Sequence, residues 1–444
     1  MSTLKQRPNR EDLVIGACLD AYGAVRHEGR LADRALEYVL RNRKHMYSAE
    51  RRAVAEYVYG LLRHQRLVDF LAERAVKGFD AMSSARKDLW RFAILRTLEG
   101  ENPSAIVRAQ TLQGDDVKVL KGLDTQRAAL DKLKPRDRLA IETSMPDFIA
   151  ERLMKEFGAD AFTAAQAMNV RAPLTVRVNT LKATREQVQQ LLEKEDVKVT
   201  PTPLSPFGLT LETRTNVFSL KTFKDGFFEV QDEGSQLLGM LVDAPPRKVV
   251  DACAGAGGKA LQLAAQMKNR GELFALDVDE RRLEDLRLRA RRAGVHNVRV
   301  QAIPADDQAL EATRALHGVC ERVLVDAPCS GSGTYRRKPD ARFRLDEGAL
   351  GDHVARQKQL LARFATFAKP KGRVIYGTCS LLTEENENVI DDFLGSHPDF
   401  ELAPATTWLG PELGEKTTRN GMLRLAPHLH NTDGFFGAVL VRKG

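Results

Sequence analysis

Two cysteines follow short apolar runs, and their side chains are suited to nucleophilic chemistry. Cys329 stands in DAPCSGSG (326–333) after the run RVLV, and Cys379 stands in GTCS (377–380) after GRVIY. A thiolate is a strong nucleophile, and the end of a strand in a parallel sheet is where a ligand cleft forms. No histidine stands beside either cysteine, so a local Cys–His pair of the protease type is not indicated. The residues alone do not rank the two thiols.

A glycine-rich turn follows another apolar run. The stretch DACAGAGGKA (251–260) comes directly after the run KVV and opens an amphipathic helix. Its glycines let the backbone turn tightly and approach a ligand closely. The turn is not a P-loop, because Ala260 rather than Ser or Thr follows Lys259, and Ala260 also breaks the G-x-G-x-x-G pattern of dinucleotide sites. Such a turn can be purely structural, so further residues must indicate the ligand.

Carboxylates follow three more of the predicted strands, counted along the chain from the run KVV. Asp277 ends the second strand, ELFAL, about twenty residues after the glycines. In this position a carboxylate accepts hydrogen bonds from ribose hydroxyls. Asp306 and Asp307 follow the third strand, with Asp306 nearer its end, and Asp326 ends the fourth. Any one of these is also typical of a surface acid or a helix cap, but four polar strand ends together favour a shared nucleoside pocket. The residues leave a nicotinamide dinucleotide and S-adenosylmethionine open.

Three regions with different patterns must position these residues. Residues 1–142 form consecutive amphipathic patterns, which predicts an all-α domain. Residues 143–235 combine short strand patterns with a helix that Thr184 caps, which predicts a small α+β domain. Residues 236–444 alternate strands with helices, which predicts a Rossmann-like α/β domain whose parallel sheet is covered on both faces. In such a sheet ligands bind beyond the carboxyl ends of the strands, and every motif above lies at such an end.

Composition excludes several classes of protein. The 444 residues are 43% hydrophobic and 29% charged, as in a folded globular protein, and the net charge of +8 favours a polyanionic partner without excluding an ordinary enzyme. The sequence lacks both an apolar run of about 20 residues and a signal-peptide pattern. The five cysteines form no C-x-x-C pair, so neither a zinc site nor a disulfide framework is indicated. We expect a cytoplasmic monomer with reduced thiols, no metal and no membrane association.

Several motifs together resemble those of a known family. DACAGAGGK, DAPCSGSGTYRRKPD, GTCSLLTEENENVI and DGFFGAVLVRK are similar to successive motifs of the Nol/Nop/Sun RNA cytosine-5 methyltransferases. The region from RVNTLKATREQV to GFFEVQDEGSQLL resembles the small, RRM-like RNA-binding domain that precedes their catalytic domain. The helical N-terminal region resembles the NusB-type RNA-binding domain of the bacterial RsmB (Sun) subgroup, which methylates small-subunit rRNA. The chain departs from the family at Ala256 and Ala260, where members usually have Pro and Thr.

The resemblance implies transfer of a methyl group from S-adenosylmethionine to C5 of a cytosine in RNA. It assigns the attack on C6 to Cys379 and product release, through proton removal at C5, to Cys329. It places Asp326 against the base and the cofactor, with Lys259 near the reacting groups. The residues implied to hold the cofactor are Cys253, Ala254, Gly255, Ala256, Gly257, Gly258, Lys259, Asp277, Asp306 and Asp326.

Basic residues shortly after the DAPCSGSG stretch offer contacts for RNA phosphates. Arg336, Arg337 and Lys338 follow the DAPCSGSG stretch, and phosphate contacts would position an RNA without choosing its sequence. The basic residues of the helical region are as typical of a solvated face as of an RNA surface. Two alternatives stay open: a non-catalytic RNA-binding or ribosome assembly factor, because the glycine turn is altered, and a methyltransferase that acts on tRNA or on DNA cytosine.

Overall fold

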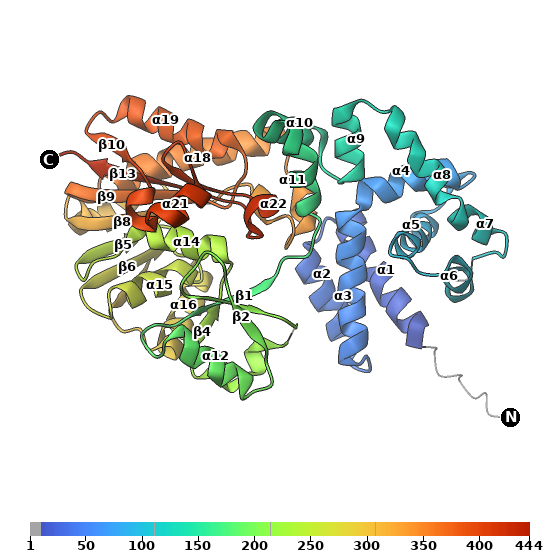
Figure 1. The fold of residues 1–444 in the computed structure, drawn as a ribbon, viewed down its shortest axis with the longest axis horizontal. Helices are drawn as coiled ribbons and strands as arrows, with labels where there is room; N and C mark the ends of the chain where they lie inside the picture. Colours follow the sequence, from blue (N-terminus) through green and yellow to red (C-terminus); the bar gives the residue numbers. More distant parts are fainter. Residues whose placement is uncertain (1–9, 111, 214, 307) are drawn as a thin grey trace. The chain divides into compact units, whose positions relative to one another are not determined.

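The computed structural model describes residues 10–110, 112–213, 215–306 and 308–444 (Figure 1). The chain divides into two compact units. The first runs through Val170 and also includes Tyr335–Arg344, and the second comprises Arg171–Thr334 and Leu345–Gly444. The predicted all-α, small α+β and α/β parts are all present. Among the described helices, none is both long enough and apolar enough to cross a membrane.

The first unit is helical, and the helices between residues 10 and 127 share one apolar core. In α3, Val54, Val58 and Leu61 are buried at helical spacing, because residues three and four apart lie on one face. The predicted boundary at residue 142 stays a prediction. The helices are α1 (Arg10–Glu28), α2 (Ala32–Arg41), α3 (Ser48–Arg63), α4 (Gln65–Ala75), α5 (Ser84–Leu98), α6 (Pro103–Ala109), α7 (Asp116–Lys121), α8 (Leu123–Arg127), α9 (Pro135–Glu142), α10 (Asp147–Phe157) and α11 (Ala161–Ala167).

The segment Tyr335–Arg344 belongs to this helical unit although the DAPCSGSG stretch, which precedes it in sequence, lies in the second unit. Arg342 is fully buried, and its guanidinium donates to the Thr143 carbonyl at 3.1 Å and to Asn169 Oδ1 at 2.8 Å. The same guanidinium lies 5.1 Å from the centre of the Tyr335 ring. These contacts offset part of the loss of hydration, because a buried guanidinium is costly unless its donors are satisfied, and Arg342 Nε has no hydrogen-bond partner among the described residues.

The second unit contains a small antiparallel sheet in the order β2-β3-β1-β4. Val176 of the central strand pairs with Leu209 on one side and Val230 on the other. Thr184 caps the helix that follows β1, as the sequence predicts, and the Gln187 side chain accepts the Thr184 N–H, which completes a capping box. The elements are β1 (Leu174–Val178), α12 (Arg185–Glu193), β2 (Val199–Pro201), β3 (Gly208–Leu211), α13 (Lys221–Lys224) and β4 (Phe228–Val230).

The large sheet of the second unit has the order β11-β12-β13-β9-β8-β5-β6-β7, and β10 pairs with β13. Its strands are β5 (Lys248–Asp251), β6 (Glu272–Asp277), β7 (Val298–Ala302), β8 (Cys320–Asp326), β9 (Ala368–Thr378), β10 (Phe400–Ala403), β11 (Thr418–Arg419), β12 (Met422–Leu425) and β13 (Phe435–Arg442). Its helices are α14 (Glu233–Val242), α15 (Gly258–Gln266), α16 (Glu280–Ala293), α17 (Gln308–Ala312), α18 (Glu347–Ala365), α19 (Glu387–Ser396), α20 (Thr406–Leu409), α21 (Pro411–Thr417) and α22 (Pro427–His430).

The predicted parallel pairing holds for β5 to β9 and is wrong for β10 to β13, which pair antiparallel. The reason is clearest between β11 and β12. Only Asn420 and Gly421 join them, both with positive φ, whereas a parallel pair needs a crossover of a dozen or more residues. The sheet is therefore mixed, and its parallel part carries the motifs.

Both faces of the large sheet are buried. Along β9, Ile375 belongs to one apolar core, whereas its neighbours Val374 and Tyr376 belong to another. Successive side chains of a strand point to opposite faces, so the two cores lie on the two sides of the sheet. Helices α14, α15 and α16 contribute to the first core, and α18 and α19 contribute to the second. This packing fixes the strand ends at which the predicted site residues stand.

Candidate active site

A cavity of about 530 Å³ lies at the carboxyl ends of β5, β6, β8 and β9. It has the concave shape and the size of a small-molecule site. Polar strand ends form part of its wall, and apolar side chains, including Ile303 and Phe364, form another part. The predicted residues that line it are Cys253, Ala254, Gly255, Asp277, Asp326, Cys329 and Cys379.

The glycine turn joins β5 to α15. Gly255 and Gly257 have φ values of +52° and +88°, a left-handed conformation that glycine adopts without strain. A Cβ at Gly257 would come within 2.5 Å of Leu286 Cγ, so this position also needs glycine for packing. At Gly255 a Cβ would meet no protein atom within 4 Å, and Gly255 lines the cavity. The turn therefore leaves open space where a ligand can approach the backbone.

Asp277 faces the turn from the end of β6. One carboxylate oxygen accepts the Gly255 N–H at 2.8 Å, and the other accepts the Asp279 N–H at 2.9 Å. These bonds fix the carboxylate at the cavity wall. A carboxylate oxygen has a second lone-pair site, so Asp277 can still accept hydrogen bonds from ligand hydroxyls.

Lys259 and Asp326 form an ion pair beside the thiols. Lys259 Nζ lies 2.6 Å from Asp326 Oδ2, and the two side chains are 10% and 28% exposed. Burial alone would lower the pKa of Lys259, but the charge and hydrogen bond of Asp326 raise it, so the group is an ammonium. Asp251, at the end of β5, is 1% exposed, and burial together with the Asp326 charge raises its pKa to about 7.

The two predicted thiols are in contact. Cys329 follows β8, Cys379 follows β9 directly, and their Sγ atoms are 3.4 Å apart. The hydrogen bond with Cys379 and the burial of the Cys329 thiol raise the pKa of Cys329 well above its ordinary value. The pairing of β8 with β9 brings residues fifty positions apart together, because both strands end at the same edge.

A buried carboxylate holds the loop of Cys329. Glu385 is fully buried and accepts the Ser330 N–H at 2.8 Å, the Ser330 hydroxyl at 2.5 Å and a Gln357 N–H at 3.0 Å. Gln357 of α18 also donates to the Pro328 carbonyl at 3.0 Å. These bonds hold the residues on both sides of Cys329.

The loop of Cys379 is fixed by neutral hydrogen bonds. Asn386 accepts the Thr378 hydroxyl at 2.6 Å and donates to the Ser380 carbonyl at 3.0 Å. The Cys379 carbonyl accepts the Gly333 N–H at 3.0 Å, so the two thiol loops are bonded to each other. The Ser332 and Ser380 hydroxyls, 2.9 Å apart, add a second link.

Some predicted residues lie elsewhere. Asp306 is exposed, does not line the cavity and accepts the Gln308 N–H at 3.1 Å. Asp307, the alternative for the same role, lies outside the described residues. Arg336 is 2% exposed in the helical unit, Arg337 is half-buried, and Lys338 is exposed. A nucleic acid can therefore reach Lys338 more readily than Arg336.

Sequence reasoning did not single out Asp251 or Glu385. Asp251 opens the DACAGAGGKA stretch at a strand end, so the rule that selected Asp277 and Asp326 could also have selected it. Glu385 stands in LLTEENENV, where a run of acids is typical of a solvated surface. Its role arises from Ser330 and Gln357, which lie far from it in sequence.

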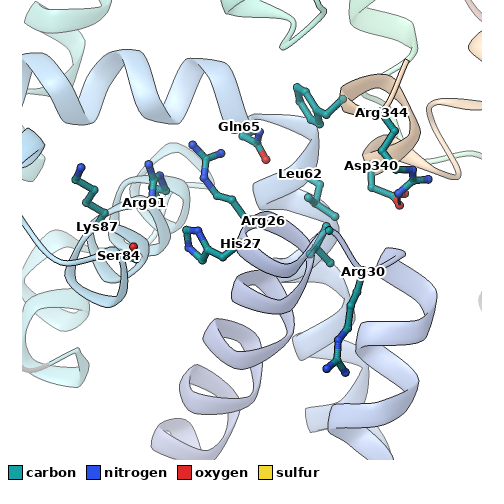
Figure 2. A pocket seen from close by; sticks show the side chains of 13 residues that line it. Arg26, His27, Arg30, Leu62, Gln65, Ser84, Lys87, Arg91, Asp340 and Arg344 are labelled. Atoms are coloured by element: carbon teal, nitrogen blue, oxygen red, sulfur yellow. Dashed lines mark hydrogen bonds and ion pairs between the residues drawn. The ribbon is translucent and has the colours of Figure 1, made fainter. Parts of the chain in front are cut away.

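The helical unit has a cavity of its own, of about 540 Å³ (Figure 2). Figure 2 shows Lys87 and Arg91 on one side, Asp340 and Arg344 on the other, and Arg26 between them. Asp69 and Asp88 hold Arg26 and Arg91 by ion pairs of 2.6 to 2.8 Å. Among the described residues, Lys87 has no carboxylate partner.

Comparison with known proteins places the chain. Residues 240–441 match the family described as 16S rRNA methyltransferase RsmB/F, and residues 145–218 match the ferredoxin-like domain of RsmF/B-like methyltransferases. A probable ribosomal RNA small subunit methyltransferase B from Synechocystis is 31% identical over 430 residues, which cover 92% of this chain and 94% of the relative. The chain belongs to the RsmB/F methyltransferase family.

Solved structures resemble this chain over most or nearly all of its length. The structure of PH0851 is 28% identical, has a TM-score of 0.76, and the match covers 98% of this chain and 99% of that one. A methyltransferase homolog from Pyrococcus horikoshii is 30% identical with a TM-score of 0.59, covering 70% of this chain and all of its own. Both the fold class and the family that the sequence predicts are confirmed.

Proposed function

We propose that this RsmB/F member transfers a methyl group from S-adenosylmethionine to C5 of a cytosine in small-subunit rRNA. The observation that carries the proposal is the pair of thiols, 3.4 Å apart, on the wall of a cavity that also holds Asp277, Asp326 and the glycine turn. One thiol can attack the cytosine ring, and its neighbour can donate or accept a proton. The family membership supports RNA as the substrate.

The cavity fits the cofactor. Its volume and its polar strand ends suit a nucleoside, the open space at Gly255 admits a ligand close to the backbone, and the Asp277 carboxylate can accept ribose hydroxyls. When bound, S-adenosylmethionine supplies the electrophilic methyl group. Ile303 and Phe364 offer apolar surface for the adenine ring. Asp306 does not line this cavity, so its predicted part in cofactor binding rests on the family resemblance alone.

Cys379 attacks C6 of the cytosine and so activates C5, which is too weak a nucleophile unaided. The addition places negative charge on the ring, and the Lys259 ammonium, held by Asp326, stabilises it. Cys329 keeps its proton at this stage because of its raised pKa and can donate toward the Cys379 thiolate.

Cys329 acts in the second half of the reaction. Once Cys379 is a thioether bonded to C6, it can no longer be an anion, so the largest cause of the raised pKa of Cys329 is removed. Cys329 can then release its own proton to solvent and, as a thiolate, take the proton from C5. The electrons of that C–H bond restore the ring double bond, and the Cys379–C6 bond breaks with its electrons on the Cys379 sulfur. The enzyme is returned with Cys379 as a thiolate and Cys329 as a thiol, and the product is 5-methylcytosine.

A transfer assay tests the proposal. The full-length protein is incubated with methyl-labelled S-adenosylmethionine and with small-subunit rRNA, tRNA or DNA, and the modified base is identified. We expect 5-methylcytosine in the rRNA. Label in DNA or tRNA alone would contradict the rRNA substrate, and absence of cofactor binding by calorimetry would favour the non-catalytic assembly factor.

We also propose that the helical unit contacts RNA phosphates at the cavity of Figure 2. Two observations support this proposal: Lys87 has no carboxylate partner in the part of the chain that the structure describes, and Arg344 is half-exposed. Lys87→Gln should weaken RNA binding. It should also make the slope of the logarithm of the binding constant against the logarithm of the salt concentration shallower, by the amount that corresponds to about one phosphate contact. Arg34→Gln, on an exposed face of α2, is the control. Equal effects of the two substitutions would contradict this cavity as the contact.

Cytoplasmic location and a monomeric state stay predictions, and light scattering in solution tests the monomeric state.

A further inference from the structure

Two arginines outside the cavity hold carbonyl groups of the glycine turn. Arg289 of α16 donates from Nη1 to the Ala256 carbonyl at 2.7 Å. Arg177 of β1 donates from Nη1 to the Gly258 carbonyl, also at 2.7 Å. Neither arginine lines the cavity. On its other side the turn is held by the bond from the Gly255 N–H to Asp277.

The small sheet anchors both arginines. Glu229 of β4 is 3% exposed and accepts Arg289 Nε at 3.1 Å and Nη2 at 3.0 Å. Gln231, just after β4, accepts a hydrogen bond from Arg177 and donates to Gln262 of α15 at 3.3 Å. A continuous polar network therefore leads from β1 and β4 of the small sheet to the turn.

This network is costly to bury. Arg177 is 3% exposed, and burial lowers its pKa to about 10, so it is still a cation near neutral pH. Buried charges are retained only where hydrogen bonds compensate for lost hydration. Here the compensation comes from Gln231 and the Gly258 carbonyl, so the fold uses a buried cation to fix one peptide group of the turn.

Fixing these carbonyls fixes the adjoining N–H groups. A peptide group is planar, so the Ala256 carbonyl sets the direction of the Gly257 N–H, and the Gly258 carbonyl sets that of the Lys259 N–H. Two glycines at positive φ flank Ala256, and glycine-rich backbone loses much conformational freedom when it binds a ligand. A turn that is already held in place loses less freedom, which strengthens binding.

We propose that Arg177 and Arg289 are positioning residues for the cofactor: through them the small sheet holds the glycine turn in its binding shape. This inference rests on the proposed function, because it takes S-adenosylmethionine as the ligand of the turn. It gives the small domain a part in cofactor affinity in addition to any contact with RNA.

Arg289 and Arg292 form a matched pair for the test. Both lie on α16, both pair with Glu229, and their side chains are 23% and 21% exposed, but the Ala256 carbonyl is bonded only to Arg289 among the described residues. Arg292 lies over the Phe223 ring instead, 3.8 Å from its centre. Loss of either arginine removes an ion pair of the small sheet, and only the loss of Arg289 releases the turn.

The experiment measures the dissociation constant of S-adenosylmethionine by calorimetry for the full-length protein and its variants, together with the melting temperature. We expect Arg289→Met to weaken binding roughly tenfold, as for loss of a hydrogen bond from a charged donor, and Arg292→Met to change it less than twofold. If the two variants have similar melting temperatures, a difference in their affinity for S-adenosylmethionine comes from the position of the turn and not from the stability of the fold.

Glu229→Gln is a second variant, in case Arg289→Met does not fold. It keeps the size of the side chain but weakens the hold on Arg289, and we expect roughly threefold weaker binding. Equal constants for the wild-type chain and Arg289→Met, or for Glu229→Gln where Arg289→Met fails to fold, would overturn the inference. A wild-type protein that does not bind S-adenosylmethionine would instead contradict the proposed function.

Discussion

Replacing Asp251 with asparagine removes a carboxyl group that the fold buries at the end of β5. The residue is 1% exposed, and the backbone of Cys253 and the charge of Lys259 offset only part of the effect of burial on the pKa of its carboxyl group. Burial, together with the charge of Asp326, raises the pKa of Asp251 from 3.8 to about 7. Asparagine has nearly the same shape and does not titrate, so the substitution isolates the effect of this one proton.

The direction of the effect follows from where the proton is bound. Unfolded chains lose it near pH 4, whereas the folded chain keeps it until about pH 7. Between these values the folded state binds one more proton, so the free energy of unfolding falls by about 1.4 kcal/mol per pH unit as the pH rises. Because the slope halves as the pH reaches the folded-state pKa, the wild-type chain loses about 2.3 kcal/mol relative to Asp251→Asn from pH 5 to pH 7.

Urea unfolding at several pH values measures this difference. The chain has two tryptophans, Trp90 in the helical unit and Trp408 in the second unit, so a Trp90→Phe background makes fluorescence report on the unit that contains Asp251. Asp352→Asn, at an exposed position on α18, is the control and should show a difference that is constant with pH. A constant difference for Asp251→Asn as well would refute the reasoning.

Three further predictions concern the thiols and their support. Cys379→Ala should abolish methyl transfer while calorimetry still detects cofactor binding; substantial turnover would contradict the role of Cys379. Cys329→Ala should accumulate a covalent protein–RNA adduct that survives a denaturing gel, because the step that releases the product is blocked, and a variant without adduct would count against that role. Glu385→Gln should lower the free energy of unfolding by about 2 kcal/mol, because the amide group cannot accept all the donors that the carboxylate accepts. Glu401→Gln, at an exposed position on β10, should change the unfolding energy by less than about 0.5 kcal/mol, and an equal loss in both variants would contradict the supporting role of Glu385.

Much of the site was predictable from the sequence, because one rule of the fold determines where most of its residues lie. Apolar strands that alternate with helices form a parallel sheet, and the residues after each strand then meet at one edge. Asp277, Asp326, Cys329 and Cys379 satisfy this rule and line the cavity together. Asp306 shows its limit, since it stands four residues beyond β7 and lies on the surface.

The burial of charged side chains by partners that are distant in sequence was not predictable from the sequence. YRRKPDARFR looks like an exposed basic segment, yet Arg342 is fully buried. Its acceptors are carbonyl groups of Thr143, Ser144 and Met168 and the side chain of Asn169, more than 170 residues away in sequence. The burial of Arg177 and Glu385 has the same origin. No local pattern of residue types indicates a partner that only the tertiary fold supplies.

The two halves of the site are held by different parts of the second unit. Contacts from Gln357 of α18 and from Glu385 and Asn386 hold the thiol loops. The glycine turn is held through Arg177 and Arg289, whose anchors lie on or next to β4 of the small sheet. Ala256 stands between two glycines with positive φ, and the bond from Arg289 to its carbonyl group restricts this flexible part of the turn from outside. Cofactor affinity and thiol reactivity should therefore respond to different substitutions, even though both act on one cavity.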